Sequence, residues 1–299
     1  MDKKLLFVFN PHSGKAMIKN KLLGIIQTFV AEGYRVEVYP TSKRADATNI
    51  IKLRGAEFNR IVISGGDGTL NEGISGLLEL EEKKRPCVGY IPTGTTNDFA
   101  SNLKIPKDMK RAARISVLGS SFLCDVGKFN EKRFLYVAAF GAFTDVAYDT
   151  PQANKNVLGQ LAYVLEGIKK LHNIKSYKLN LKTEEQEISG EFIFGMASNS
   201  NYVAGVKAGD KLHAMLNDGL FEILLVKNPA NLIEFQALIS DLMMQNIKTD
   251  RFIILKTNRA SFEFETEVPW TLDGEFGGSI EKADISLEEK AVEFVCGIE

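Results

Sequence analysis

The sequence is poor in the residues that build disulfide frameworks and zinc sites. Its 299 residues include three histidines and three widely spaced cysteines, Cys87, Cys124 and Cys296, with no CxxC pair. An odd number of isolated cysteines does not make a disulfide framework, and the few scattered Cys and His residues exclude a Cys/His zinc site. This cysteine usage is typical of a protein from a reducing compartment.

A strong charge of one sign and long apolar runs are also missing. Lys and Arg total 37 and Asp and Glu total 38, a formal charge of −1, which excludes a globally basic nucleic-acid-binding protein. The apolar stretch Leu5–Phe9 is too short for the core of a signal peptide. No stretch reaches the ~18 consecutive apolar residues of a membrane span. We therefore expect a cytoplasmic protein that meets any lipid substrate at the membrane surface, as a peripheral protein.

The first part of the chain alternates between two hydrophobic patterns. Short apolar or β-branched runs, typical of buried strands, cover Leu5–Asn10, Tyr34–Tyr39, Arg60–Ser64 and Val88–Ile91. Segments with helical spacing lie between them, at Lys15–Glu32, Asp46–Gly55 and Thr69–Leu80. This alternation predicts an α/β domain with a parallel sheet covered by helices.

Beyond about residue 125 the pattern changes to strands separated by short turns. The strand-like runs are Phe129–Phe140, Tyr177–Thr183, Glu187–Ser198, Leu220–Val226, Phe252–Lys256, Arg259–Glu265 and Ile285–Leu287. Two helical segments, Val157–Leu171 and Ala230–Asn246, interrupt them, and we interpret their apolar stripes as core packing rather than membrane contact. The pattern predicts a mainly antiparallel domain, a β-sandwich or a distorted barrel. We expect domains at residues 1–127 and 128–299, with the last strand, Val292–Cys296, pairing with either domain.

Three polar loops that contain glycine follow three of the strands in the first domain. The loops are Asn10–Lys15 (NPHSGK), Ser64–Glu72 (SGGDGTLNE) and Pro92–Ala100 (PTGTTNDFA). Glycines leave backbone N–H groups uncovered, and a helix N-terminus after such a loop favours an anion such as phosphate. Each loop by itself is also compatible with an ordinary turn. In the third loop, Thr96 or Asn97 would then cap the helix that starts at Asp98. Together, at one edge of one sheet, the loops predict a site for a phosphate-rich nucleotide. Neither the Walker spacing nor GxGxxG is present.

These motifs, in this order, resemble the diacylglycerol kinase catalytic domain of soluble bacterial lipid kinases. The GGDGT element alone is shared with NAD kinases and resembles the phosphofructokinase-like superfamily. Cys124–Gly127 (CDVG) and Leu272–Glu275 (LDGE) extend the resemblance over essentially the whole chain. The resemblance implies a nucleotide-binding domain of the phosphofructokinase/NAD kinase type and a β-sandwich domain that carries a metal site and the catalytic base.

The resemblance also implies ATP and Mg²⁺ as cofactors and assigns residues to them. The ATP site would be lined by Asn10, Pro11, His12, Ser13, Gly14, Thr41, Gly66, Asp67, Gly68, Thr69, Leu70, Asn71, Glu72 and Thr95, with no catalytic role for His12. Asp67 and Asp125 would organise the catalytic Mg²⁺ and the phosphates, and Glu275 would accept the proton of the lipid hydroxyl. Asp218 and the backbone carbonyls of Met215 and Leu220 would hold a second, structural Mg²⁺. From the residues alone, Asn217-Asp218-Gly219 and Asp273-Gly274 are first of all hairpin turns.

The expected function is therefore an ATP- and Mg²⁺-dependent lipid kinase that converts diacylglycerol to phosphatidic acid. A kinase for another lipid alcohol (sphingosine, ceramide or phosphatidylglycerol) is the nearest alternative, followed by an NAD kinase. A regulator that has lost catalysis is a further alternative, against which the intact Asp67, Asp125 and Glu275 speak. The family implies a possible homodimer, and we expect no nucleic-acid partner.

Overall fold

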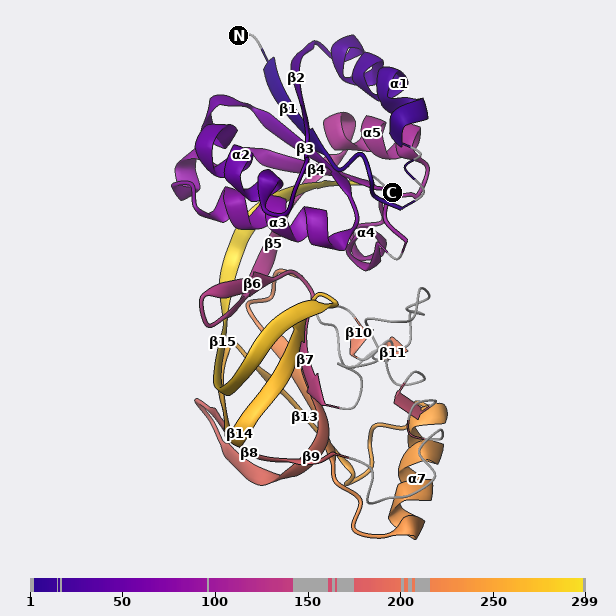
Figure 1. The fold of residues 1–299 in the computed structure, drawn as a ribbon, viewed down its shortest axis with the longest axis vertical. Coiled ribbons are helices and arrows are strands. Elements are labelled where there is room, and N and C mark those ends of the chain that lie inside the picture. Colours follow the sequence, from indigo (N-terminus) through magenta and orange to yellow (C-terminus); the bar gives the residue numbers. More distant parts are fainter. Residues whose placement is uncertain are drawn as a thin grey trace. The chain divides into compact units, whose positions relative to one another are not determined.

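The computed structural model describes residues 3–14, 16, 18–95, 97–141, 161–162, 165, 175–199, 202–203, 206–207 and 216–297. The chain forms two compact units (Figure 1). The first contains Met1–Asp125 and Lys290–Glu299, and the second contains Val126–Glu289. The first unit therefore ends two residues before the expected boundary at residue 127, and it includes the last ten residues, which the expected domains assign to 128–299.

The first unit contains a sheet in which neighbouring strands are parallel. The strands are β1 (Lys3–Phe9), β2 (Tyr34–Pro40), β3 (Arg60–Gly65) and β4 (Cys87–Pro92), in the order β2-β1-β3-β4. The end of β15 (Glu275–Cys296) pairs with β4, with Phe294 opposite Val88. The partner of the last strand, which the sequence leaves open, is thus in the first unit. The apolar runs of β1 and β3 are buried, as expected for central strands.

Helices cover both faces of this sheet. They are α1 (Ile18–Ala31), α2 (Asp46–Arg54), α3 (Asp67–Leu78), α4 (Asp98–Asn102) and α5 (Met109–Leu118), with short 3₁₀ turns at Gly55–Glu57 and Glu82–Lys84. Figure 1 shows α1 and α5 on one face and α2 and α3 on the other. Helix α5 is absent from the sequence prediction because it buries only small residues, Ala112, Ala113 and Ser116, and so has no large apolar stripe.

The second unit is strand-rich and antiparallel. Its strands are β5 (Ser120–Phe129), which begins in the first unit, β6 (Lys132–Phe134), β7 (Val137–Gly141), β8 (Tyr177–Thr183), β9 (Glu187–Ser198), β12 (Phe221–Lys227), β13 (Phe252–Thr257), β14 (Arg259–Leu272) and most of β15, with a small hairpin of β10 (Tyr202–Val203) and β11 (Val206–Lys207). The run expected as one strand, Phe129–Phe140, is divided by a turn at Asn130, which has φ +50°.

The long strands β9 and β14 close this sheet on itself. Each of them pairs with β8 along one part of its length and with β7 along another. The four strands therefore form a closed cycle within one sheet, as in the distorted barrel that the sequence analysis names beside a β-sandwich, and not the two separate sheets of a sandwich. Inside it, the indole of Trp270 lies 4.9 Å from the ring of Phe140 and 5.3 Å from the ring of Phe262, measured between centroids.

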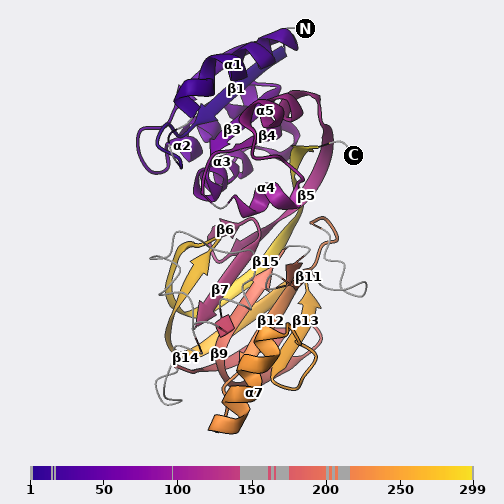
Figure 2. The same cartoon turned by 90° about the vertical axis from the view of Figure 1, so that its right-hand side faces the viewer.

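A second apolar cluster lies on the other face of β9 and β12. Helix α7 (Leu232–Met243) lies over these strands (Figure 2). Its Phe235, Leu238 and Leu242 are buried in the cluster. The inner stripe of this helix thus belongs to the core, as the sequence analysis prefers. The other expected helix, Val157–Leu171, lies outside the described residues except for Leu161, Ala162 and Leu165, which are buried in the same cluster.

Candidate active site

The three glycine-containing loops of the first unit meet at one edge of its sheet. The backbone N–H of Thr93 donates to the carbonyl of Gly65 at 2.8 Å, and that of Asn10 donates to the carbonyl of Ser64 at 2.9 Å. Because the strands are parallel, the loops after β1, β3 and β4 leave the sheet at the same edge. The structure thus joins segments that lie far apart in the sequence.

Glycine is required where these loops touch. Gly14 has φ +55°, and a Cβ on it would lie 2.2 Å from the carbonyl oxygen of Thr93. A Cβ on Gly94 would lie 2.6 Å from the Cα of Gly66. Backbone is therefore in contact with backbone, and the surface of these turns presents peptide groups rather than side chains.

Helix α3 begins inside this cluster of loops. Its N-cap is Gly66, which has no side chain to cap the helix. The orphan N–H groups and the partial positive charge of a helix N-terminus favour an anion. Asn10 contacts the same turn, because its Nδ2 donates to Thr69 Oγ1 at 3.4 Å, while its Oδ1 accepts from the backbone N–H of His12 at 2.9 Å. The arrangement suits the phosphates of a nucleotide.

Asn97 closes the loop after β4 through its side chain and does not cap α4, the helix that follows the loop. Asn97 has φ +56°, and its amide group accepts from the N–H of Gly94 at 2.9 Å and donates to the carbonyl of Gly94 at 2.7 Å. It makes no side-chain cap of α4, so capping is not the role of this residue. Thr95, expected in the ATP site, is exposed on this loop, and Thr96 lies outside the described residues.

A fourth loop, after β2, is joined to the same edge. The backbone N–H of Thr41 donates to the carbonyl of Phe9 at 2.9 Å, and Thr41 is buried. The carboxylate of Glu72 accepts from the backbone N–H of Ala45 at 2.9 Å. Ala45 has φ +63°, a strained conformation for alanine. Glu72, expected among the residues that line the ATP site, therefore uses its side chain to support this loop.

The two aspartates expected at the catalytic metal accept hydrogen bonds from backbone groups. Asp67 is half-buried, and its Oδ1 accepts from the N–H of Phe99 at 3.4 Å. Asp125 is buried, and its Oδ1 accepts from the N–H of Lys290 at 2.6 Å. No group of three or more His, Cys, Asp or Glu residues within the described parts of the chain is arranged to hold a metal ion. The two carboxylates fit a Mg²⁺ whose ligands are a carboxylate, water and nucleotide phosphates, rather than a Mg²⁺ surrounded by protein ligands only.

In the second unit, Glu275 is exposed at the start of β15. It follows Asp273 and Gly274, which have φ +50° and +83°, and it pairs with Leu272 across a two-residue turn. This is the type of hairpin that the Asp-Gly pair predicts. Glu275 therefore lies directly after the turn of a long hairpin.

Asp273 is a functional candidate that the sequence analysis treats only as a turn residue. Its side chain is buried and accepts three backbone hydrogen bonds, from Leu135 at 2.7 Å and from Tyr136 and Val137 at 3.0 Å each. The hydroxyl of Tyr136 also donates to the carbonyl of Asp273 at 3.2 Å. The turn that carries Glu275 is thereby anchored to the start of β7. The LDGE motif contains this residue, but its partners come from a distant part of the sequence.

The residues expected at the structural Mg²⁺ are described only in part. Met215 lies outside the described residues. Asp218 is exposed, and its Oδ1 accepts from the backbone N–H of Leu220 at 3.2 Å, in a turn where Gly219 has φ +74°. A single exposed carboxylate is compatible with a hydrated Mg²⁺ and does not by itself specify the ion.

Glu222 on β12 is a buried carboxylate that sequence reasoning missed. It is 1% exposed, and Lys256 Nζ on β13 lies 2.9 Å from its Oε1. Burial raises the pKa of Glu222 above its ordinary value, and the nearby Lys256 opposes this shift. A charged residue inside the apolar run FEILLV is the only sequence signal for it.

Comparison with known proteins identifies the family. The model of the diacylglycerol kinase catalytic domain matches residues 4–129. Diacylglycerol kinase of Bacillus subtilis (strain 168) is 34% identical over 290 residues, which cover 95% of this chain and 94% of that protein. The chain belongs to the diacylglycerol kinase family. A second member, from Staphylococcus carnosus (strain TM300), is 31% identical over 293 residues and is covered to 94%.

Solved structures show that the two-unit fold is that of the family. A diacylglycerol kinase from Bacillus anthracis str. Sterne superposes with a TM-score of 0.75 at 23% identity, covering 99% of this chain and 97% of that one. Another structure from the same organism reaches a TM-score of 0.82. The match to the catalytic-domain model contains the three loops, Asp67 and Asp125, whereas Glu275 lies outside it. Among the helices of the described residues, none is long and apolar enough to cross a membrane.

Proposed function

We propose that this member of the diacylglycerol kinase family transfers the γ-phosphoryl group of ATP to the hydroxyl of diacylglycerol, giving phosphatidic acid and ADP. The observation that carries the proposal is the contact of three glycine-containing loops around the start of α3, whose N-cap is Gly66. Such a surface of backbone N–H groups binds the phosphates of a nucleotide. The names of the relatives support the lipid acceptor.

The first unit supplies the nucleotide-binding groups. Asn10–Gly14, Thr41, Gly66–Glu72 and Thr95 bind ATP, with Asn10 connecting the loops after β1 and β3. Bound Mg²⁺ neutralises phosphate charge during phosphoryl transfer. Asp67 and Asp125 would hold the Mg²⁺, directly or through water. Their hydrogen bonds to Phe99 and Lys290 fix the carboxylates, so little reorganisation is needed during the reaction.

Glu275 acts as the proton acceptor in this proposal. The acceptor hydroxyl oxygen forms the new bond to the γ-phosphorus, the bond from that phosphorus to the bridging oxygen of ADP breaks, and the hydroxyl proton moves to the Glu275 carboxylate. Asp273 is a positioning residue, because its three backbone hydrogen bonds fix the turn before Glu275. Asp218, with the carbonyls of Met215 and Leu220, would hold a structural Mg²⁺. We further propose a cytoplasmic enzyme that binds the membrane peripherally.

A transfer assay tests the acceptor. Labelled ATP and Mg²⁺ are supplied with diacylglycerol, sphingosine, ceramide, phosphatidylglycerol or NAD, and the products are separated by phase partition. Label in the organic phase with diacylglycerol supports the proposal. Label with another lipid alcohol in preference to diacylglycerol reassigns the acceptor, and label only in aqueous NADP identifies an NAD kinase. No transfer to any acceptor would indicate a regulator without catalysis.

A further inference from the structure

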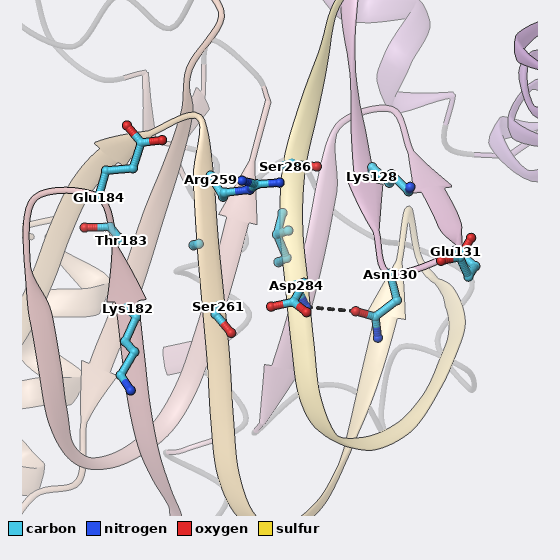
Figure 3. Close-up of a pocket in the computed structure, with 12 residues that line it drawn as sticks. Lys128, Asn130, Glu131, Lys182, Thr183, Glu184, Arg259, Ser261, Asp284 and Ser286 are labelled. Carbon is cyan, nitrogen blue, oxygen red and sulfur yellow. Dashed lines mark hydrogen bonds between the residues drawn. The ribbon is translucent and has the colours of Figure 1, made fainter.

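The second unit has a cavity of about 660 Å³ bordered by residues of β5, β8, β14 and β15. Figure 3 shows the residues that line it. It lies where β14 begins, at Arg259, whereas the Glu275 turn follows the other end of β14. The cavity is therefore separate from the turn to which the proposed reaction assigns a role.

A row of three outward side chains crosses this cavity. Arg259 on β14 lies directly opposite Ser286 on β15, while Ala260 and Ile285, the next pair in the register, are buried. Lys128 on β5 flanks the other side of β15, next to Asn130, whose backbone N–H donates to the carbonyl of Asp284 at 2.9 Å. Figure 3 shows Arg259, Ser286 and Lys128 at the same level of the three strands, with the Arg259 guanidinium directed toward Ser286.

The two cations of this row have no protein partner among the described residues. Neither Lys128 nor Arg259 makes an ion pair or a side-chain hydrogen bond there, although Glu131, Glu184 and Asp284 line the same cavity. Other lysines of the unit are paired, since Lys178 lies 3.1 Å from Glu265 and Lys282 lies 3.2 Å from Glu263. The row thus keeps two like charges on either side of a serine hydroxyl.

We propose that Lys128, Arg259 and Ser286 form a binding site for a single phosphate group, in addition to the nucleotide site. A guanidinium binds phosphate oxygens in pairs, an ammonium adds a point charge, and the serine hydroxyl donates a further hydrogen bond. The Oγ of Ser261, which also lines the cavity, is buried without a hydrogen-bond partner in the described structure. Lys182 also lines the cavity, so three cations stand beside three carboxylates, and this balance favours one phosphomonoester or phosphodiester over a polyanion such as nucleic acid.

The phosphate group has two possible sources, a phospholipid headgroup and a soluble phosphoester. Vesicles of phosphatidylcholine, with and without phosphatidylglycerol, probe the first source by co-sedimentation. Glycerol 3-phosphate probes the second by calorimetry, with excess ATP analogue present to occupy the three-loop site. Binding to vesicles that contain phosphatidylglycerol, without binding to pure phosphatidylcholine vesicles or to glycerol 3-phosphate, identifies a site for an anionic phospholipid headgroup. Binding of glycerol 3-phosphate identifies a site for soluble phosphoesters.

A matched pair of variants makes the test specific. Lys128→Ala/Arg259→Ala removes the row, and Lys178→Ala/Lys282→Ala removes the same charge from exposed, paired lysines of the same unit. We expect the first variant to bind the phosphate probe at least about tenfold more weakly than wild type and the second to bind within about twofold.

Equal affinities of the two variants, or no binding of either probe to the wild type, would overturn the proposal. Thermal unfolding checks that both variants fold, and Lys128→Gln/Arg259→Gln replaces the first variant if it does not. Kinase turnover with diacylglycerol in neutral detergent micelles is expected to stay unchanged, so failure of the second site is distinguishable from failure of the proposed reaction.

Discussion

Gly94→Ala directly tests whether contact between the loops builds the nucleotide site. The added Cβ would lie 2.6 Å from the Cα of Gly66, while ordinary contacts begin at 3.4 Å, so the two loops must separate by 3.4 − 2.6 = 0.8 Å. Misplacement of about 1 Å costs on the order of 10²-fold in rate, about 2.7 kcal/mol of transition-state stabilisation. We therefore expect kcat/KM for ATP to fall about 100-fold.

Gly24→Ala is the matched control, because it is the same substitution in the same unit. Gly24 lies within α1, and nothing lies within 4 Å of its added Cβ. Replacing a helical glycine with alanine stabilises by about 0.8–1 kcal/mol, so this variant should keep its activity and unfold at a slightly higher temperature.

The assay for this pair combines steady-state kinetics with the increase in Tm on adding nucleotide. Overpacking also costs Gly94→Ala about 1–3 kcal/mol of unfolding free energy, which urea unfolding measures separately. Wild-type kcat/KM in Gly94→Ala, or equal losses of activity in both variants, would refute the inference that loop contact positions the nucleotide.

Four further substitutions probe the carboxylates. Glu275→Gln should lower turnover about 10²–10⁴-fold while ATP affinity stays, and turnover equal to wild type would exclude Glu275 as the base. Asp67→Asn should raise the Mg²⁺ concentration needed for half-maximal activity, and unchanged Mg²⁺ dependence would remove it from the site. Asp273→Asn should destabilise the second unit by about 1.5–3 kcal/mol, measured by urea unfolding, because it loses charge-assisted hydrogen bonds; no loss would contradict the anchoring role. Burial raises the folded-state pKa of Glu222 above 4.5, so its contribution to stability is present below pH 4.5 and is lost as the pH rises through the raised value. Glu222→Gln should flatten this pH dependence of the unfolding free energy, and a wild-type profile would refute the assignment.

Local sequence patterns determined most of the elements and the position of the loops. Continuous apolar runs such as Leu5–Phe9 identified central strands, because a strand buried on both faces has no polar side. The Asp-Gly pair at 273–274 identified a hairpin, because both residues accept positive φ. Helix α5 was missed because Ala112, Ala113 and Ser116 pack closely without a large apolar stripe.

For the candidate site, too, the sequence predicted some features and missed others. The sequence by itself indicates that the glycines of the three loops free the backbone. The roles of Asp67, Asp125 and Glu275 were assigned by the motif resemblance alone. The hydrogen bonds that support these loops and carboxylates could not be predicted from the sequence. Asp273 anchors to residues near 136, Glu72 to Ala45 and Asp125 to Lys290, and such pairs depend on distant segments coming together.

By itself, therefore, the sequence determined which segments are strands or helices, where glycine and turn residues free the backbone, and which family the motifs resemble. Only the tertiary structure decided that the last strand pairs with β4, that β7, β8, β9 and β14 form a closed cycle, and that Glu222 and Asp273 are buried. The physical reason is the distance along the chain over which each interaction acts. Dihedral preferences and hydrophobic periodicity act over a few residues, whereas strand order, burial and charge pairing depend on packing between segments far apart in the chain.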